Sequence, residues 1–193
     1  MSKVLIPLAQ GFEDLEAVTL IDLLRRAAIN VTTAGLVTGP VTGSRGTVIV
    51  PDMTLATILD NDLVPEYDMI VLPGGQPGAT NLENDARVIN LLNKMAKTNK
   101  YIGAICAAPA VLAHAGLLSK RRATAYPGTL TAKNYPDIIA MDDSVVIDGK
   151  IITSRGPGTA MDFSLQLIEL LTDKQARDKV EAALMRSETG VMK

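Results

Sequence analysis

The stretch Tyr101-Ile102-Gly103-Ala104-Ile105-Cys106-Ala107-Ala108-Pro109-Ala110-Val111-Leu112 holds the only cysteine among the 193 residues. Its first five residues are typical of a buried strand. The residues after Cys106 favour a helix with Pro109 in the first turn, where a missing N–H is tolerated. A nucleophile at such a strand-to-helix turn is lifted out of the sheet beside the free amides of the helix start, and the helix dipole favours its thiolate. The alternative is a small buried hydrophobe, the role of most lone cysteines.

The composition predicts one globular domain with an aliphatic core. Apolar residues make up 47% of the chain, charged residues 21% and aromatic residues 3%. A single cysteine excludes an internal disulfide framework. No apolar stretch approaches the roughly 20 residues that span a bilayer, and Met1-Ser2-Lys3 leads directly into a strand-like segment without room for a signal peptide. We therefore expect a cytoplasmic protein with a single domain over residues 1–186 and a frayed tail over 187–193.

Charge and ligand-forming residues exclude several function classes. The net charge is −2, and the one basic cluster, Lys120-Arg121-Arg122, is short, so no specific nucleic-acid binding is expected. One cysteine and one histidine cannot form the usual zinc shells, and no carboxylate spacing resembles a calcium loop. We expect no metal and no membrane association.

Unbroken apolar runs alternate with helical stretches along the chain. Continuous runs are typical of parallel strands covered on both faces, and Asp148-Gly149 is a strong hairpin signal. Strands are expected over 4–9, 31–36, 47–50, 69–72 and 101–105 and in a hairpin over 145–153. Helices are expected over 15–28, 85–97, 107–115, 157–170 and 173–185. This order predicts an α/β fold with an open, doubly wound, mostly parallel sheet, helices on both faces and a small β-hairpin.

The first predicted helix, Leu15 to Ala28, carries two apolar stripes. One stripe contains Leu15, Val18, Ile21 and Leu24, and the other contains Ala17, Leu20 and Leu23. A helix exposed on one side needs only one such stripe. We therefore expect one stripe to face the sheet and the other to pack against a partner subunit, which predicts a homodimer.

Candidate catalytic residues follow three of the predicted strands. Glu13 and Glu16 follow the first strand, Gly74-Gly75 follows the strand over 69–72, and Cys106 follows the strand over 101–105. In open α/β sheets, sites form outside the carboxyl ends of the strands. If these strands are neighbours, a carboxylate, a glycine turn and a thiol meet in one crevice.

Glu16 is the expected partner of the thiol. His114, the only histidine, lies eight residues further along the predicted helix, about 12 Å away, which excludes a conventional Cys–His dyad within one chain. Glu16 and Cys106 work best with one proton between them, as a thiolate and a carboxylic acid. The amides of Gly75 and Ala107 could then stabilise an oxyanion. The alternative for Glu16 is an acid that only suits the helix dipole.

Two glycine-containing segments have simpler explanations as well. Gly74-Gly75 could be a turn that needs positive φ, and it lacks the spacing of a nucleotide-binding fingerprint. The segment from Arg155 to Thr159 could be an ordinary helix start, although an arginine beside a helix N-terminus is also a plausible anion site.

Taken together, these residues resemble the ThiJ/PfpI superfamily, and within it the DJ-one (parkinsonism-associated deglycase) branch with its bacterial YajL-like proteins. The matching stretches span nearly the whole chain: Gln10-Gly11-Phe12-Glu13-Asp14-Leu15-Glu16, Ser44-Arg45-Gly46, Val71-Leu72-Pro73-Gly74-Gly75, Ala104-Ile105-Cys106-Ala107-Ala108-Pro109 and Thr153-Ser154-Arg155-Gly156-Pro157-Gly158-Thr159.

The resemblance implies a flavodoxin-like, class I glutamine amidotransferase-like homodimer without a cofactor, with the first helix at the dimer interface. It implies Cys106 as nucleophile, Glu16 as its protonated partner, and Gly75 and Ala107 as amide donors. The remaining pocket or anion-binding candidates are Glu13, Gly74, Arg45, Tyr126 and Arg155. The implied activities are glyoxalase-type conversion of methylglyoxal to lactate, deglycation of early protein adducts, chaperone activity, and oxidative-stress sensing through a cysteine sulfinic acid.

The chain departs from the family pattern at two positions. Ala107 stands where the protease-like branch has a histidine, which argues against a peptidase. Tyr126 stands where several closer relatives have a histidine near the site. A phenol donates a hydrogen bond but is a poor base near neutral pH, so Tyr126 predicts a modest catalytic rate or only lines the pocket. Nothing in the sequence supports the thiamine-biosynthesis role attached to some relatives.

Three hypotheses follow for Cys106. It is the nucleophile of an enzyme acting on small α-oxoaldehydes or their protein adducts, the sensor of a redox-regulated protective protein, or an inert packing residue. The chain has no second cysteine, so an oxidised Cys106 cannot resolve into an internal disulfide.

Overall fold

A seven-stranded sheet forms the centre of the protein, in the order β10-β11-β7-β6-β1-β2-β5. The structure, a computed structural model, describes residues 1–186, and the predicted tail 187–193 lies outside the described residues. All neighbouring strands of this sheet are parallel except the β10–β11 pair. The strands are β1 Lys3–Leu8, β2 Asn30–Gly35, β5 Met53–Thr54, β6 Met69–Leu72, β7 Tyr101–Ile105, β10 Val145–Asp148 and β11 Ile151–Ser154.

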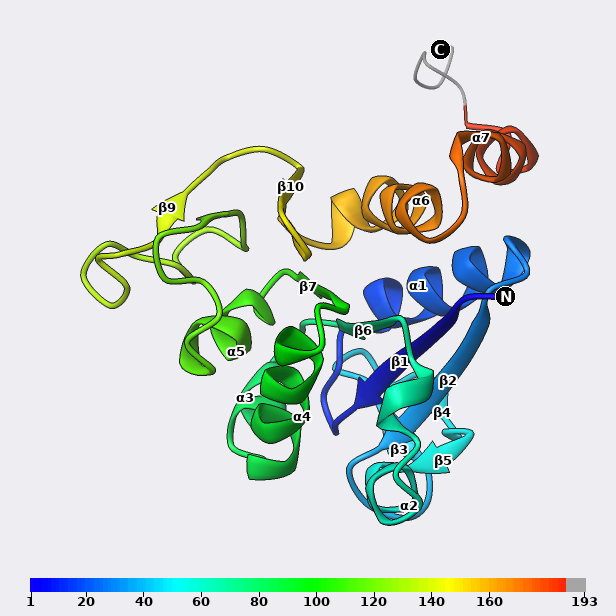
Figure 1. Ribbon diagram of the computed structural model, residues 1–193, viewed down its shortest axis with the longest axis horizontal. Coiled ribbons are helices and arrows are strands. Elements are labelled where there is room, and N and C mark those ends of the chain that lie inside the picture. Colours follow the sequence, from blue (N-terminus) through cyan, green and yellow to red (C-terminus); the bar gives the residue numbers. More distant parts are fainter. Residues whose placement is uncertain (187–193) are drawn as a thin grey trace.

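Helices cover both faces of the sheet, as the predicted doubly wound fold requires (Figure 1). One face carries α1 Asp14–Arg26, α6 Ala160–Leu171 and α7 Lys174–Ala183. The other carries α2 Leu55–Asp60, α3 Gly78–Glu83, α4 Ala86–Lys97 and α5 Pro109–His114. Short 3₁₀ turns lie at Val64–Glu66 and Pro157–Thr159.

The central strands feed two hydrophobic clusters, one on each face. In β1, Val4, Ile6 and Leu8 contact the α1/α6 layer, whereas Leu5 contacts the α2–α5 layer. Alternate residues of a strand point to opposite faces, so a strand buried on both sides needs an unbroken apolar run. This is the physical reason that the predicted parallel strands were recognisable in the sequence.

The main features of the predicted sheet are confirmed, and one predicted strand is misplaced. The hairpin is present, with Gly149 at φ +63° in its turn. The segment predicted as a strand over 47–50 does not join the main sheet: β4 (Val48–Ile49) pairs only with β3 (Val41–Thr42) in a separate two-stranded sheet. The edge of the main sheet is instead β5, which pairs with β2 over two residues. A second small sheet joins β8 Arg122–Ala123 to β9 Ile139–Ala140.

The two apolar stripes of α1 have different surroundings. Ala17, Leu20 and Leu23 are buried against the sheet and α6. Leu15 and Val18 remain 52% and 45% exposed. The buried stripe therefore forms part of this chain's own core. The other stripe is covered only in part by residues 1–186, because Leu24 is buried and Ile21 is partly buried while Leu15 and Val18 are exposed.

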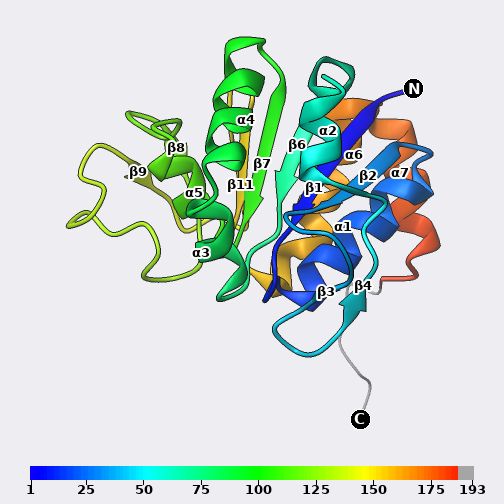
Figure 2. The ribbon, with the colours of Figure 1, turned by 90° about the horizontal axis from the view of Figure 1, so that it is seen from below.

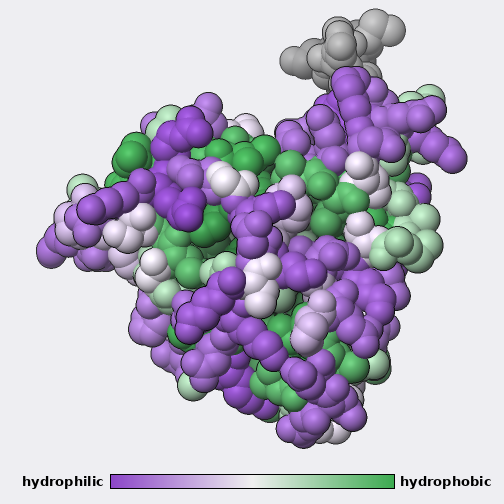
Figure 3. All heavy atoms as spheres, in the orientation of Figure 1, coloured by the Kyte–Doolittle hydropathy of each residue, from purple (hydrophilic) through white to green (hydrophobic). Residues whose placement is uncertain are grey.

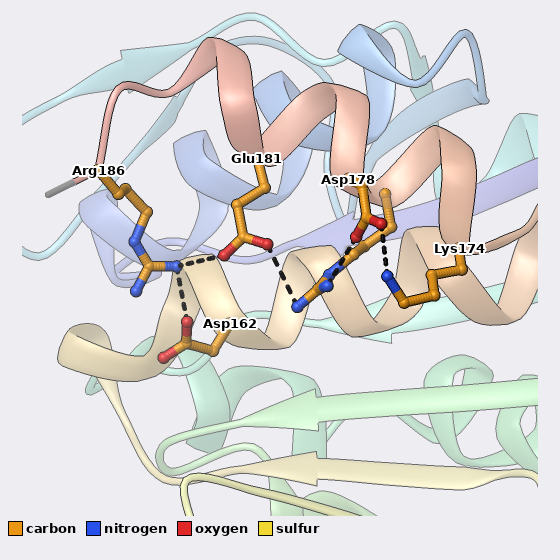
Figure 4. Close-up of polar contacts among 6 residues, drawn as sticks. Asp162, Lys174, Asp178, Glu181 and Arg186 are labelled. Carbon is orange, nitrogen blue, oxygen red and sulfur yellow. Dashed lines mark hydrogen bonds and ion pairs between the residues drawn. The ribbon is translucent and has the colours of Figure 1, made fainter. Parts of the chain in front are cut away.

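One ion pair joins the segment after α7 to α6, and the other ion pairs drawn in Figure 4 involve residues of α7. Arg186 reaches Asp162 of α6 at 2.7 Å, and Arg177 reaches Glu181 at 3.2 Å within α7. Figure 3 shows largely hydrophilic side chains over α7 at the upper right of that view. No helix within residues 1–186 is long and apolar enough to cross a membrane.

Candidate active site

Cys106 lies at a sharp turn between β7 and α5. β7 ends at Ile105, α5 begins at Pro109, and Cys106 itself has φ +63°. A left-handed conformation at a non-glycine residue costs on the order of 1–3 kcal/mol, so the surroundings must hold it. The Cys106 amide donates to the Ser154 carbonyl at 3.0 Å, and its carbonyl accepts from the Tyr126 amide at 2.8 Å. The predicted elbow is therefore present and fixed on both sides by backbone hydrogen bonds.

Glu16 approaches from the first turn of α1. Its side chain is fully buried, and its Oε2 accepts a hydrogen bond from the Gly74 amide at 2.8 Å. Its Oε1 is buried without a hydrogen-bond partner in the structure. An acid that served only the helix dipole would remain in water, so the structure favours a specific role for this carboxyl group.

The sheet order explains why Glu16 and Cys106 meet. β7, β6 and β1 are neighbours and parallel, so their carboxyl ends lie at one edge of the sheet. Cys106, Gly74-Gly75 and the segment leading to Glu16 follow these three strands. The predicted crevice is thus formed by three adjacent strand ends.

Gly74 packs closely against both Cys106 and Glu16. A Cβ on Gly74 would lie 2.7 Å from the Cβ of Cys106 and 2.9 Å from Oε2 of Glu16. Gly75 adopts φ +89°, and a Cβ there would overlap the Glu13 backbone, whose amide donates to the Gly74 carbonyl at 2.9 Å. Both glycines are required by close approach, and Gly75 also by its backbone conformation.

Burial and the contact between Cys106 and Glu16 raise the pKa of both groups. Desolvation raises the pKa of Glu16 to about 7, against the lowering effect of the Gly74 amide and the Cys106 hydrogen bond. Desolvation and the Glu16 carboxylate raise the pKa of Cys106 to about 12, against the amides of Gly75 and Ala107. Because the two groups are in contact, they titrate as a pair: one proton leaves near pH 7, the other leaves only under strongly alkaline conditions, and either group can hold the proton that remains in between.

The loop after β3 is attached to the beginning of α1. Ser44 Oγ donates to Glu13 Oε2 at 3.1 Å, and the Arg45 amide donates to Asp14 Oδ2 at 2.8 Å. The Thr47 amide donates to Asp14 Oδ1 at 2.7 Å. The Arg45 side chain itself is exposed, so this candidate touches the edge of the site through its backbone. Sequence reasoning missed Asp14, because an acid in the first turn of a helix has an ordinary explanation in the helix dipole.

Tyr126 and Arg155 line a neighbouring cavity of about 220 Å³ together with Ala125, Met141 and Asp142. Tyr126 is 54% exposed and reaches Cys106 through its backbone amide. Arg155 donates from Nη1 to Asp142 Oδ1 at 2.8 Å, so its charge already has a partner. Cys106 does not line this cavity.

His114 takes no part in the site. It lies at the end of α5, 55% exposed, with Nδ1 3.3 Å from Glu83 Oε1 of α3. This agrees with the expectation that His114 does not form a Cys–His dyad with Cys106 within one chain. Within residues 1–186, no three His, Cys, Asp or Glu side chains gather in a way that could hold a metal ion.

Gly74→Ala is expected to destabilise the protein by about 1–3 kcal/mol and to slow alkylation of Cys106, because the new methyl group would overlap Cys106, Glu16 and the Ile105 carbonyl. Chemical unfolding and the rate of iodoacetamide labelling measure these effects. Gly158→Ala is the matched control, since a Cβ there meets nothing within 4 Å. Equal behaviour of the two variants would contradict the close packing around Gly74.

Comparisons with known proteins agree with this geometry. The model of the DJ-1/PfpI family matches residues 2–170. The chain is 41% identical to protein dj-1beta of Drosophila melanogaster, over 96% of this chain and 98% of that protein. It is 36% identical to a protein of Caenorhabditis elegans named glutathione-independent glyoxalase DJR-1.2, over 87% of each. The crystal structure of Drosophila DJ-1beta superposes with a TM-score of 0.88 at 40% identity, over 97% of this chain and all of that one.

Relatives of greater length are known too. Two DJ-1 homologues of Arabidopsis thaliana are each 41% identical, and the match covers 37% and 46% of their own length. The chain therefore spans less than half of these two relatives. The family match and the full-length Drosophila relative together lead to one conclusion: this chain belongs to the DJ-1/PfpI family.

Proposed function

We propose that this protein is a cofactor-independent enzyme that acts on α-oxoaldehydes such as methylglyoxal, or on their early adducts with proteins. The observation that carries the proposal is the contact of a buried carboxyl group, Glu16, with a cysteine on a strained turn, Cys106. A relative named as a glutathione-independent glyoxalase supports the same chemistry.

The reactive form of the pair has its proton on Glu16 and its charge on Cys106. The thiolate would accept hydrogen bonds from the amides of Gly75 and Ala107 and from the O–H of Glu16. In the competing form, a carboxylate beside a thiol, Glu16 accepts hydrogen bonds within residues 1–186 only from the Gly74 amide and the weak S–H donor of Cys106. A buried charge is most stable where more donors surround it, so the hydrogen bonds favour the thiolate.

The proposed reaction begins with attack of the Cys106 sulfur on the aldehyde carbon. A carbon–sulfur bond forms, the carbonyl electrons move to oxygen, and the Glu16 proton neutralises that oxygen to give a hemithioacetal. The Glu16 carboxylate then removes the proton from the same carbon to give an enediolate with its charge on the neighbouring oxygen. Glu16 returns this proton to the neighbouring carbon, and the hydroxyl proton of the first carbon passes to the neighbouring oxygen, which yields the thioester of lactate. Water then cleaves the carbon–sulfur bond, releases lactate and restores Cys106. The amides of Gly75 and Ala107 would stabilise the oxyanion.

One carboxyl group has to perform these proton transfers in turn. Tyr126, at the position where several relatives have a histidine, offers a phenol O–H, which can donate a hydrogen bond but supplies no imidazole base. A modest rate is the consequence. The direct test is to incubate the protein with methylglyoxal without added glutathione and to measure lactate. Lactate formation above a heat-denatured control supports the proposal, and its absence argues against it.

Oxidation sensing is the second candidate, and it rests on the same thiolate. Cys106 is only 8% exposed and is the chain's sole cysteine, so a sulfenic acid there has no internal thiol to react with. It would advance to a sulfinic acid or be capped by an external thiol. Intact mass spectrometry after mild peroxide treatment tests this: a stable gain of two oxygen atoms on Cys106 supports sensing, and an unchanged mass contradicts it. A chaperone role would add protection of unfolded clients after this oxidation.

We also propose that the chain forms a homodimer through α1. Val18 and Ile21 of α1 form the apolar side of a cavity of about 300 Å³ together with Ile49 and Val50, and Leu15 lies one turn away on the same side. The polar side of this cavity is formed by Asp22, Arg25, Thr33 and Asp52. Exposed apolar surface of this kind is typical of a protein interface.

Val18→Asp is expected to shift the protein from dimer to monomer, because it places a charge in this apolar surface. Analytical ultracentrifugation at several concentrations measures the shift. Ile139→Asp, on the exposed strand β9, is the matched control and should leave the mass unchanged. A monomeric unmodified protein, or a Val18→Asp variant that remains dimeric, would contradict this interface.

A further inference from the structure

Another cavity lies at the opposite end of β7 from Cys106. Its volume is about 440 Å³. It opens between the C-terminal ends of α4 and α5 and the turn of the β10–β11 hairpin, elements that lie together around the amino end of β7 (Figure 2). Its lining is Ala96, Asn99, Lys100, Ile102, Gly116, Leu117, Ser119, Arg121, Gly149, Lys150 and Ile151. The proposed chemistry uses none of these residues.

The lining combines an apolar part with positive charge. Ala96, Ile102, Leu117 and Ile151 supply the apolar part, and Ile102 and Ile151 are fully or nearly fully buried. The cations are Lys100, Arg121 and Lys150, and every ionisable residue of the lining is basic. This arrangement suits a small molecule with an apolar body and an anionic group.

Acidic residues around the cavity only partly neutralise these cations. Asp68 Oδ1 lies 3.4 Å from Lys100 Nζ, and Asp148 Oδ1 lies 3.0 Å from Arg121 Nη1. Asp148 is also shared with Arg122, at 4.0 Å. Lys150 forms no ion pair within residues 1–186, and its Nζ lies 3.6 Å from the centre of the Tyr101 ring. Four cations therefore face two carboxylates, on a chain whose net charge is −2.

Arg121 has unused hydrogen-bonding capacity. Within the described residues its guanidinium donates only from Nη1, to the Asp148 carbonyl at 3.3 Å and to its carboxylate at 3.0 Å. Nε and Nη2 are left for a ligand. A Cβ on Gly149 would lie 3.5 Å from Nη1, which places the guanidinium over the hairpin turn. The free edge of a guanidinium matches two oxygens of a phosphate.

The cations could instead serve to neutralise the negative C-terminal ends of α4 and α5. Several of the last carbonyls of α4 and α5 already accept backbone hydrogen bonds, however. The Lys100 amide donates to Met95 at 3.0 Å, and the Leu117 amide donates to Leu112 at 3.0 Å. Helix dipoles would be served equally well by cations on the outer surface, whereas these three cations line one cavity.

We propose that this cavity binds a small organic phosphate, with the phosphate at Arg121, Lys150 and Lys100 and the apolar part on Ile102, Leu117 and Ile151. The site is separate from Cys106, so this proposal does not depend on the proposed enzymatic function.

Titration calorimetry with phenyl phosphate at low ionic strength tests the proposal, because salt screens such contacts. We expect saturable binding to the unmodified protein and about tenfold weaker binding to Arg121→Gln and to Lys150→Gln, the loss typical of one charge-assisted contact. Lys97→Gln, at the exposed end of α4 and outside the cavity, is the matched charge control and should bind unchanged. Cys106→Ser should also bind unchanged, which separates this cavity from the candidate active site.

Two further ligands test each part of the site. Inorganic phosphate should bind more weakly than phenyl phosphate, and phenol should not bind in the same range. Absence of saturable phenyl phosphate binding would overturn the proposal. It would also be overturned if Arg121→Gln and Lys150→Gln bound phenyl phosphate as tightly as the unmodified protein does while unfolding in the same way as that protein. If inorganic phosphate bound as tightly as phenyl phosphate, the proposed role of the apolar residues would be overturned. If phenol bound as tightly as phenyl phosphate, the proposed role of the cations would be overturned.

Discussion

Cys106→Ser is expected to lower the turnover of methylglyoxal by at least about a thousandfold, because a serine hydroxyl beside a carboxyl group is not ionised near neutral pH and cannot replace the thiolate as nucleophile. The side chains are similar in size, and serine faces the same φ of +63° as cysteine. The variant should therefore fold. Steady-state lactate production by purified protein measures the loss.

His114→Gln is the matched control for this experiment. His114 lies at the far end of α5, paired with Glu83, and should be replaceable without loss of turnover. Thermal unfolding of both variants shows whether the fold is intact. Turnover by Cys106→Ser at the rate of the unmodified protein would exclude nucleophilic catalysis by this residue.

The second large effect concerns stability as a function of pH. Burial raises the pKa of Glu16 from 4.5 to about 7 in the folded protein, and because Glu16 and Cys106 are coupled, this is the pH at which the pair loses its first proton. Between these two pH values the folded state binds more protons than the unfolded state, so stability falls as the pH rises. The contribution of Glu16 is fully present below about pH 4.5 and lost by about pH 7, a difference of roughly 3 kcal/mol. The raised pKa of Cys106 extends the loss above pH 9.

Glu16→Gln removes the carboxyl group from this balance. Its free energy of unfolding should change less between pH 4.5 and 7, and it should exceed that of the unmodified protein above pH 7. Urea unfolding at several pH values measures both curves. Asp60→Asn, at the exposed end of α2, controls for the change in net charge. A variant whose stability falls with pH as steeply as that of the unmodified protein would show that Glu16 ionises freely in the folded state.

The sequence was most informative where burial imposes a pattern. β1, β6 and β7 are covered on both faces, so they appear as continuous apolar runs. The predicted crevice required these strands to be neighbours, and the observed sheet order meets that condition. The hairpin was recognisable from Asp148-Gly149, whose turn needs a residue with positive φ. The two apolar stripes of α1 were recognisable because each has helical spacing.

The missed elements are short and depend on distant contacts. β5 pairs with β2 over only two residues, too few to show a periodic pattern. α3 begins at Gly78, which packs against Gly11, and no local signal reports a contact between residues so far apart in the chain. The pairing of Arg155 with Asp142 is of the same kind, because Asp142 lies in an irregular segment. Site residues at strand ends are thus predictable, and the partners that loops bring to them are not.

The central claim is that the pair of Cys106 and Glu16 holds its single proton on the carboxyl group, and the pH dependence of Cys106 alkylation tests it most directly. If the claim holds, the alkylation rate of the unmodified protein rises with a midpoint near or below pH 7, under the value of about 8.5 for an ordinary thiol. Glu16→Gln should raise that midpoint, because the thiolate loses its O–H donor. The claim is contradicted if the unmodified thiol ionises only above about pH 9 and Glu16→Gln lowers the midpoint, since a repelling carboxylate would then have been removed.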